Sequence, residues 1–375
     1  MELPDEIKAL LGRHSLYVRG RGGQRLALRL ANLSGLGLSR FDLSRAEMIA
    51  CNLTGAQLEG CRFVEADLSN SLFIGANLKG CDFSRAILRG VRFYKSDLQE
   101  AQMQQADLRT GGVTLHKKGK DGDALISREF VSDLSYCNLE GAVLDEAVLR
   151  KGVMKGANFR NASLRQVDLS DANLEGSILI GADLAGANVR GANIAGAAIE
   201  VTDQTRRLFA GEPAFIEHVK NLREIERIVA AHEEWVESRG QAGARADFTG
   251  RTLAGIDLRG RELSAVSFKN AALAGVNLCH AKLAAADFSG ARLSHADLSG
   301  ADLRAVNFTD AHLLHVELEA AELTALKLAT GLEMPPRFQG AKLEWVNAEG
   351  ATLAPGCLTG AEVRFGKLAD GIKAA

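Results

Sequence analysis

Residues 291–310 read ARLSHADLSGADLRAVNFTD and repeat a five-residue pattern four times. A large apolar residue occupies every fifth position: Leu293, Leu298, Leu303 and Phe308. The residue two positions before each of them is alanine or valine. A period of five fits neither a helix, with 3.6 residues per turn, nor a plain strand, with a period of two. It predicts a chain that points two residues inward, on one face as in a strand, and then turns a corner.

The same period covers most of the chain. Large apolar residues recur in three runs of 17, 14 and 17 positions, over Leu33–Val113, Leu134–Ile199 and Phe248–Leu328. After a short fault the last run resumes in phase over Phe338–Leu368. With 46 % hydrophobic residues, a chance run of 17 has a probability of 0.46 to the 17th power, on the order of 10⁻⁶. The repeat is therefore the main feature of the sequence.

The phenylalanines indicate how many corners close one coil. They recur at every twentieth position in three columns, Phe248/Phe268/Phe288/Phe308, Phe63/Phe83 and Phe73/Phe93. Stacking of identical side chains at this interval predicts four pentapeptides per turn and a square cross-section. Successive coils would then hydrogen-bond at the usual inter-strand spacing of ~4.8 Å.

The repeat unit resembles that of the pentapeptide-repeat family, written A(D/N)LXX. Matching units are ADLSN at 66–70, ANLKG at 76–80 and ADLSG at 296–300. The resemblance covers roughly three quarters of the chain. It implies a right-handed quadrilateral β-helix with a solid interior, so we expect an all-β fold with helical caps.

The ends of such a coil expose unpaired edges that must be covered. Apolar residues follow helical spacing over residues 225–236, and residues 7–18 repeat them 218 positions earlier. The chain therefore looks like two tandem modules, each a helix followed by a β-helix, with a further helix predicted over Thr202–Leu222. We expect a helical cap, a first β-helix with a loop insertion, a helical linker and a second β-helix, over residues 1–30, 31–201 (insertion 114–131), 202–244 and 245–375.

Four residues depart from the repeat, because they are large where a small residue belongs: Leu36, Phe41, Arg251 and Arg261. All four lie in the first coil of their run, where a cap could alter the surroundings. Both predicted cap helices also carry a histidine, His14 and His232. These histidines could be ligands or bases, but packing on the first coil is the favoured interpretation.

Composition excludes several classes of protein. The net charge of −2 predicts no direct nucleic-acid binding. No run approaches 18 apolar residues and no secretory leader is evident, so we expect no membrane span and a cytoplasmic protein. The six cysteines form no CxxC pair, in keeping with reduced thiols.

The sequence contains no nucleophile elbow, phosphate loop or metal-spaced cluster. A coil lined by alanine and leucine also leaves no cavity for catalysis. We therefore predict no catalytic residue, no cofactor and no metal. His295 and His315 stack at outward positions and could share a metal, but surface histidines are favoured. Cys61 and Cys81 stack at inward positions, where burial is favoured over a disulfide or redox role.

Two candidate interaction surfaces remain. Residues 116–123, HKKGKDGD, interrupt the repeat, and their Asp-Gly suits a hairpin turn between residues 113–115 and 124–126. A loop that projects from a smooth prism, here with His116, Lys117, Lys118 and Lys120, is either a contact point or a solvated excursion.

The second candidate is an outward aromatic column. Trp345 and Phe365 both stand two residues after a large inward residue, 20 positions apart. Exposed stacked aromatics often mark an interface, here between copies in a homo-oligomer. The alternative is that the C-terminal tail or another cap covers them.

Two functions follow from these observations. The first is a non-enzymatic scaffold for protein–protein interaction with an unknown partner. The second comes from the family resemblance, because some pentapeptide-repeat proteins mimic DNA and bind DNA gyrase, which protects it from quinolones. That mimicry needs a strongly acidic surface, but the net charges of residues 31–113, 132–201 and 245–330 are only 0, −3 and −1. The scaffold is therefore favoured.

Overall fold

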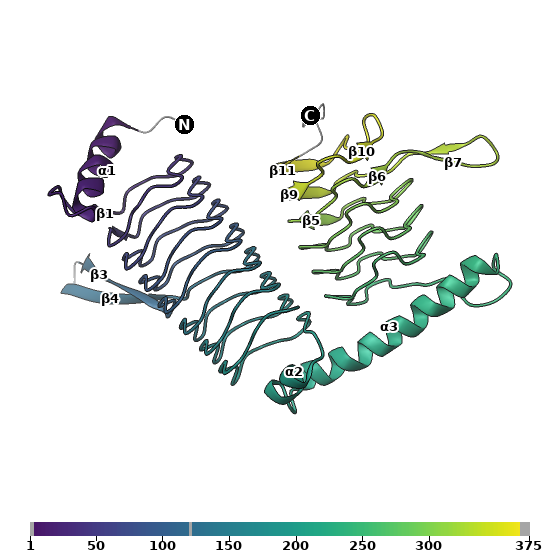
Figure 1. Ribbon diagram of the computed structural model, residues 1–375, viewed down its shortest axis with the longest axis horizontal. Helices are drawn as coiled ribbons and strands as arrows, with labels where there is room; N and C mark the ends of the chain where they lie inside the picture. The colour runs from purple at the N-terminus through teal and green to yellow at the C-terminus, as the bar shows by residue number, and fades with distance from the viewer. Residues whose placement is uncertain (1–3, 120–121, 368–375) are drawn as a thin grey trace. The chain divides into compact units, whose positions relative to one another are not determined.

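The computed structural model describes residues 4–119 and 122–367. The side chains of residues 113–119, 122–128 and 365–367 lie outside this description. The chain forms two compact units, Met1–Ala210 and Gly211–Ala375, and each contains a regular coil and at least one helix (Figure 1).

Parallel bridges join residues that are 20 positions apart on all four sides of a coil, as in Asn52↔Leu72, Gln57↔Asn77, Arg62↔Asp82 and Asp67↔Ile87. This spacing confirms four pentapeptides per turn. Most rungs are single bridges rather than extended strands, because the chain turns a corner after every inward pair. The short parallel strands are β1 (Ala27–Arg29), β2 (Glu47–Ile49), β5 (His312–Leu314), β6 (Glu322–Leu323), β9 (Lys342–Asn347), β10 (Thr352–Leu353) and β11 (Glu362–Lys367). They pair as β1–β2, β5–β9–β11 and β6–β10.

The backbone geometry of the corners explains which positions of the pentapeptide are glycine, aspartate or asparagine. The residue two after the large apolar one has positive φ, +66° at Gly55 and +58° at Glu65, which accounts for the many glycines at this position. The Asp or Asn before the large residue stabilises the same corner. Its side chain accepts a backbone N–H two residues later, as Asp67 Oδ1 does from Ser69 at 3.0 Å.

Stacked apolar columns fill the interior. The rings of Phe63 and Phe83 lie 4.9 Å apart and parallel to within 3°. In the second unit Phe288 lies between Phe268 at 4.7 Å and Phe308 at 5.1 Å, measured between ring centroids. All five rings are fully buried, so the predicted columns are confirmed.

A hairpin interrupts the repeat region of the first unit (Figure 1). Strands β3 (Gly111–Gly119) and β4 (Gly122–Phe130) pair antiparallel, and both extend beyond the predicted strands. The rung from Arg92 leads to Asp133, 41 positions further on instead of 20, so the insertion adds 21 positions and leaves the ladder intact. The prediction that Val113 belongs to the first run was wrong, because Val113 lies in β3 and the run ends at Leu108.

A second hairpin interrupts the repeat region of the second unit, and the sequence pattern did not predict it. Strands β7 (Leu326–Lys327) and β8 (Glu333–Met334) pair antiparallel, and the rung from Asn307 leads to Arg337, 30 positions further on. The prediction that Leu328 continues the run was therefore wrong, and this side chain is 38 % exposed. The ten extra positions equal two pentapeptides, so the insertion does not change the phase of the repeat.

Three helices accompany the coils in the described part of the chain: α1 (Asp5–Val18), α2 (Asp203–Leu208) and α3 (Pro213–Glu237). The two stretches with helical spacing, residues 7–18 and 225–236, lie in α1 and α3. The single further helix predicted over Thr202–Leu222 was wrong. Gly211, with a φ of +82°, and Pro213 at the start of α3 separate two helices there, because proline favours the first turn of a helix.

Candidate interaction surfaces

His14 and His232 fasten the cap helices to the coils. His14 Nδ1 accepts the backbone N–H of Leu26 at 3.0 Å, and His232 Nδ1 accepts that of Ala246 at 3.2 Å. Both rings are fully buried, and His232 stacks on Trp235 at 5.6 Å between centroids. The predicted packing of these histidines on the first coil is confirmed.

Each cap histidine must be neutral to make this hydrogen bond, with its proton on Nε2. Burial lowers the pKa of both rings. Each histidine also has an acidic and a basic side chain nearby. These are Asp42 and Arg25 for His14, and Glu262 and Arg245 for His232. Helices α1 and α3 are therefore held to their coils in the same way, by a neutral histidine that accepts a backbone N–H. We call this hydrogen bond the histidine latch.

Acidification is expected to weaken both latches. Because burial lowers the pKa of His14 and His232 only in the folded protein, the unfolded chain takes up protons first as the pH falls through ~6.5. Stability is thus complete above that pH and declines below it. Thermal unfolding followed by circular dichroism should give a lower Tm at about pH 5.5 than at about pH 7.5.

The exposed His312 supplies the control for this experiment. His312→Gln should leave the pH dependence of the Tm unchanged. The double variant His14→Leu, His232→Leu should reduce that dependence. A wild-type Tm that is equal at both pH values would contradict the latch.

The two arginines that depart from the repeat pair with α3. Arg261 donates to both carboxylate oxygens of Glu233, at 2.7 and 3.0 Å, and to Glu226 at 3.1 Å. Arg251 donates to Glu224 at 2.8 Å. The expectation that a cap alters the surroundings of these positions is confirmed, since their charges face helix carboxylates instead of the apolar interior.

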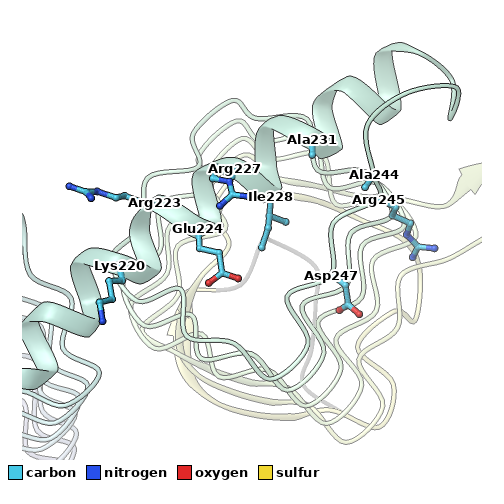
Figure 2. A pocket seen from close by; sticks show the side chains of 9 residues that line it. All are labelled: Lys220, Arg223, Glu224, Arg227, Ile228, Ala231, Ala244, Arg245 and Asp247. Carbon is cyan, nitrogen blue, oxygen red and sulfur yellow. The ribbon is translucent and has the colours of Figure 1, made fainter.

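A shallow pocket of about 600 Å³ lies between α3 and the start of the second coil (Figure 2). Sequence reasoning missed it, although its cations Lys220, Arg223 and Arg227 stand at helical spacing. In Figure 2 Glu224 extends toward the coil and Arg223 extends away from it. The cations are therefore spread along the helix and do not converge on one point, which argues against a tight site for a small anion.

The aromatic column on the second coil also contains the two stacked histidines. His295 and His315 do stack, with centroids 4.8 Å apart, but they are only 8 % and 9 % exposed, so the surface interpretation was wrong. Trp345 continues this column, stacked 5.9 Å from His315, because the ten-residue insertion separates these rungs by 30 positions. Trp345 is partly buried. The side chain of Phe365, its predicted partner, lies outside the described residues.

The remaining candidates give no reactive centre. Cys61 and Cys81 are fully buried, and their thiols donate to the carbonyls of Leu38 and Leu58. Burial raises the pKa of the Cys61 thiol to about 11, so the nucleophilic thiolate is disfavoured. Among the residues whose side chains the structure describes, no three His, Cys, Asp or Glu side chains are grouped as a metal site would require. None of the helices within residues 4–119 and 122–367 is both long and apolar enough to span a bilayer.

The predicted hairpin residues are only partly placed. His116, Lys117 and Lys118 belong to β3, opposite Leu125, Ala124 and Asp123 of β4. Their side chains, and the whole of Lys120, lie outside the described part of the structure.

Comparison with known proteins gives a match over both coils. The family model for Pentapeptide repeats (8 copies) matches residues 28–63, 51–90, 76–110, 132–166, 167–200, 244–278, 262–300, 273–310 and 286–324. The matched segments exclude hairpin β3–β4 and all three described helices. No curated protein matches the chain significantly.

Solved structures of pentapeptide-repeat proteins are similar to the chain at low identity. HetL, involved in heterocyst differentiation regulation in the cyanobacterium Nostoc sp. strain PCC 7120, is 22 % identical, with 96 % of this chain and 95 % of HetL covered and a TM-score of 0.24. Full-length QnrB1, a plasmid-mediated fluoroquinolone resistance protein, is 18 % identical, with coverages of 73 % and 92 % and a TM-score of 0.26. Rfr23 from the cyanobacterium Cyanothece 51142 is 17 % identical, with coverages of 52 % and 99 % and a TM-score of 0.23. Because the family model matches more than half of the residues, the chain belongs to the pentapeptide-repeat family.

Proposed function

We propose that this chain is a non-enzymatic scaffold that presents hairpin β3–β4 to a protein partner in the cytoplasm. Its two coils are tandem right-handed quadrilateral β-helices, and the first of them holds the hairpin on a regular framework. The observation that carries the proposal is the placement of the hairpin. It adds 21 positions between Arg92 and Asp133 without disturbing the ladder, so the coil does not need it for its own closure.

The coil itself offers little to a substrate. Its inward positions are filled by buried apolar side chains, and the pocket beside α3 is shallow and lined by spread charges. Catalysis needs convergent polar groups in a concave site. A rigid prism with a projecting hairpin suits binding instead, since loops on a rigid framework carry many contacts.

A DNA mimic that binds a topoisomerase is the less favoured function. The resemblance to QnrB1 is to the fold alone, and the regular blocks of this chain are close to neutral. A mimic would instead need rows of carboxylates to replace phosphates.

Removing the hairpin tests the scaffold directly. Deletion of residues 111–131 joins Thr110 to Ser132 and restores the regular spacing of 20 positions for the rung from Arg92. We expect the Tm to change little, because the ladder is kept, while partners captured by cross-linking in the native cell are lost.

The second hairpin supplies a matched control. Deletion of residues 326–335 restores the same spacing between Asn307 and Arg337 and should leave capture intact. Partners that survive the first deletion, or that both deletions abolish equally, would contradict a contact through β3–β4. Enrichment of topoisomerase subunits alone would favour the DNA mimic.

A further inference from the structure

A row of cations flanks the base of hairpin β3–β4. The bridges Ile87↔Asp107 and Asp107↔Val148 make three successive rungs of one face. Arg89, Arg109 and Arg150 occupy the same position on these rungs, two residues after the bridging residue, and Lys151 follows Arg150. All three guanidinium side chains are about half exposed to solvent. The rungs therefore present four cations side by side.

One carboxylate within these rungs offsets the row. Asp107 accepts from Arg89 at 2.6 Å and from Arg109 at 2.8 Å. Partial burial alone would raise the pKa of this carboxyl, but the hydrogen bonds from both arginines outweigh it and lower the pKa to about 2. Arg150 pairs with Asp171 of the next rung, at 3.9 Å, and Lys151 has no ion pair with another described residue. The three rungs thus carry a charge of +3, or +2 when Asp171 is counted, although residues 31–113 and 132–201 as a whole are neutral or acidic.

Exposed apolar side chains adjoin this row. Ile87 is 40 % exposed on the first of the three rungs, and Phe130 and Val131, where β4 returns to the coil, are 39 % and 40 % exposed. The Phe130 carbonyl lies beside Gly90, and Ser132 donates to the Arg109 carbonyl at 3.1 Å. The backbone at the hairpin base therefore lies beside the rungs that carry Arg89 and Arg109.

The fold does not require this arrangement. Like charges on adjacent rungs are destabilising, and other columns of the coil alternate them, as Arg45–Glu65–Arg85 does with its two ion pairs. Exposed apolar residues at the same place also gain nothing from solvent. Arginine with aromatic and aliphatic neighbours is, by contrast, a combination enriched at protein interfaces.

We propose that the surface formed by Arg89, Arg109, Arg150, Lys151 and Phe130 binds an acidic segment of a partner protein that also carries an apolar side chain. Carboxylates of the segment would pair with Arg150 and Lys151, while its apolar side chain would cover Phe130. This inference rests on the proposed scaffold function and names the chemistry of the partner.

Fluorescence anisotropy tests this proposal on the full chain. The probe is a fluorescein-labelled peptide with glutamates on both sides of a central phenylalanine, and a peptide with glutamines in place of the glutamates is the control. We expect saturable binding of the glutamate peptide that weakens with salt. The double variant Arg150→Gln, Lys151→Gln should raise the Kd about tenfold, and Phe130→Ser should raise it further.

The matched control removes two cations from the other unit. Lys269 and Arg292 are exposed and form no ion pair among the described residues, so Lys269→Gln with Arg292→Gln should leave the Kd unchanged. Equal weakening by both double variants, or no saturable binding, would overturn the proposal. Tighter binding of a labelled DNA duplex than of the peptide would do the same.

Cross-linking in the native cell separates this proposal from the scaffold function. Capture that requires the hairpin but not Arg150 and Lys151 would keep the scaffold and overturn the acidic partner. Capture lost in both cases supports the two together.

Discussion

Replacement of Phe288 by aspartate is expected to unfold the second unit. Phe288 is fully buried between Phe268 and Phe308, so a carboxylate there has neither water nor a partner. Removal of a buried phenylalanine alone costs about 3–5 kcal/mol, and the unpaired charge adds to this. The total approaches the stability of a whole domain, about 5–15 kcal/mol.

Circular dichroism and limited proteolysis would measure this effect. We expect new cleavage within residues 245–367 at temperatures where the wild-type chain is resistant. Phe288→Leu keeps the column apolar and should therefore lower the stability much less than the aspartate does. Arg292→Asp introduces the same charge at an exposed position of the next pentapeptide and should leave the Tm nearly unchanged. An unaltered Tm for Phe288→Asp would disprove the inward assignment.

Replacement of His232 by leucine is expected to loosen α3 from its coil. Leucine fills much of the ring's volume but cannot accept the backbone N–H of Ala246, which then lies buried without a partner. An unsatisfied buried N–H costs about 1–3 kcal/mol. Loss of stacking on Trp235 adds to the effect.

Amide hydrogen exchange at Ala246 and Trp235 fluorescence would follow this opening. We expect faster exchange at Ala246 in His232→Leu, and the equivalent change at Leu26 in His14→Leu. The exposed His280 provides the control, since His280→Leu should leave exchange at Ala246 unchanged. Protection of Ala246 equal to the wild type would show that the histidine does not hold the cap.

The regular part of the fold could be predicted from sequence with little loss. Each pentapeptide contributes one inward pair and one corner, so the pattern is enough to place the small inward residue Cys51, the ladder residue Asn52 and the corner residue Gly55 alike. The interval between Phe63 and Phe83 then sets four pentapeptides per turn. Local periodicity succeeds here because every contact of one coil repeats in the next.

The insertions could be predicted only in part. Hairpin β3–β4 shifts the phase of the repeat by one residue, and the sequence there contains an Asp-Gly pair that is typical of hairpin turns. Hairpin β7–β8 adds ten residues, the length of two pentapeptides, so Leu328 keeps the correct phase without lying in the coil. Periodicity is blind to an insertion whose length is a multiple of its own period.

The candidate surfaces depended most on tertiary structure. The regular interval of 20 positions places Phe365 on the rung after Trp345, and β9 and β11 keep this register. Hairpin β7–β8 in addition brings Trp345 onto His315, 30 positions earlier, which the regular interval does not predict. The cations Arg109 and Arg150 become neighbours only because the ladder closes over the hairpin between them. No local pattern in the sequence relates these two positions.

The sequence by itself determined the five-residue unit, the four pentapeptides per turn and the cap helices, because these depend on contacts at a fixed interval along the chain. The tertiary structure decided which residues become neighbours across each interruption. It brought the arginines together at the base of β3–β4 and placed Trp345 on the histidine column. An insertion changes the sequence distance between rungs without changing their spacing in space, so only the folded chain shows which side chains share a surface.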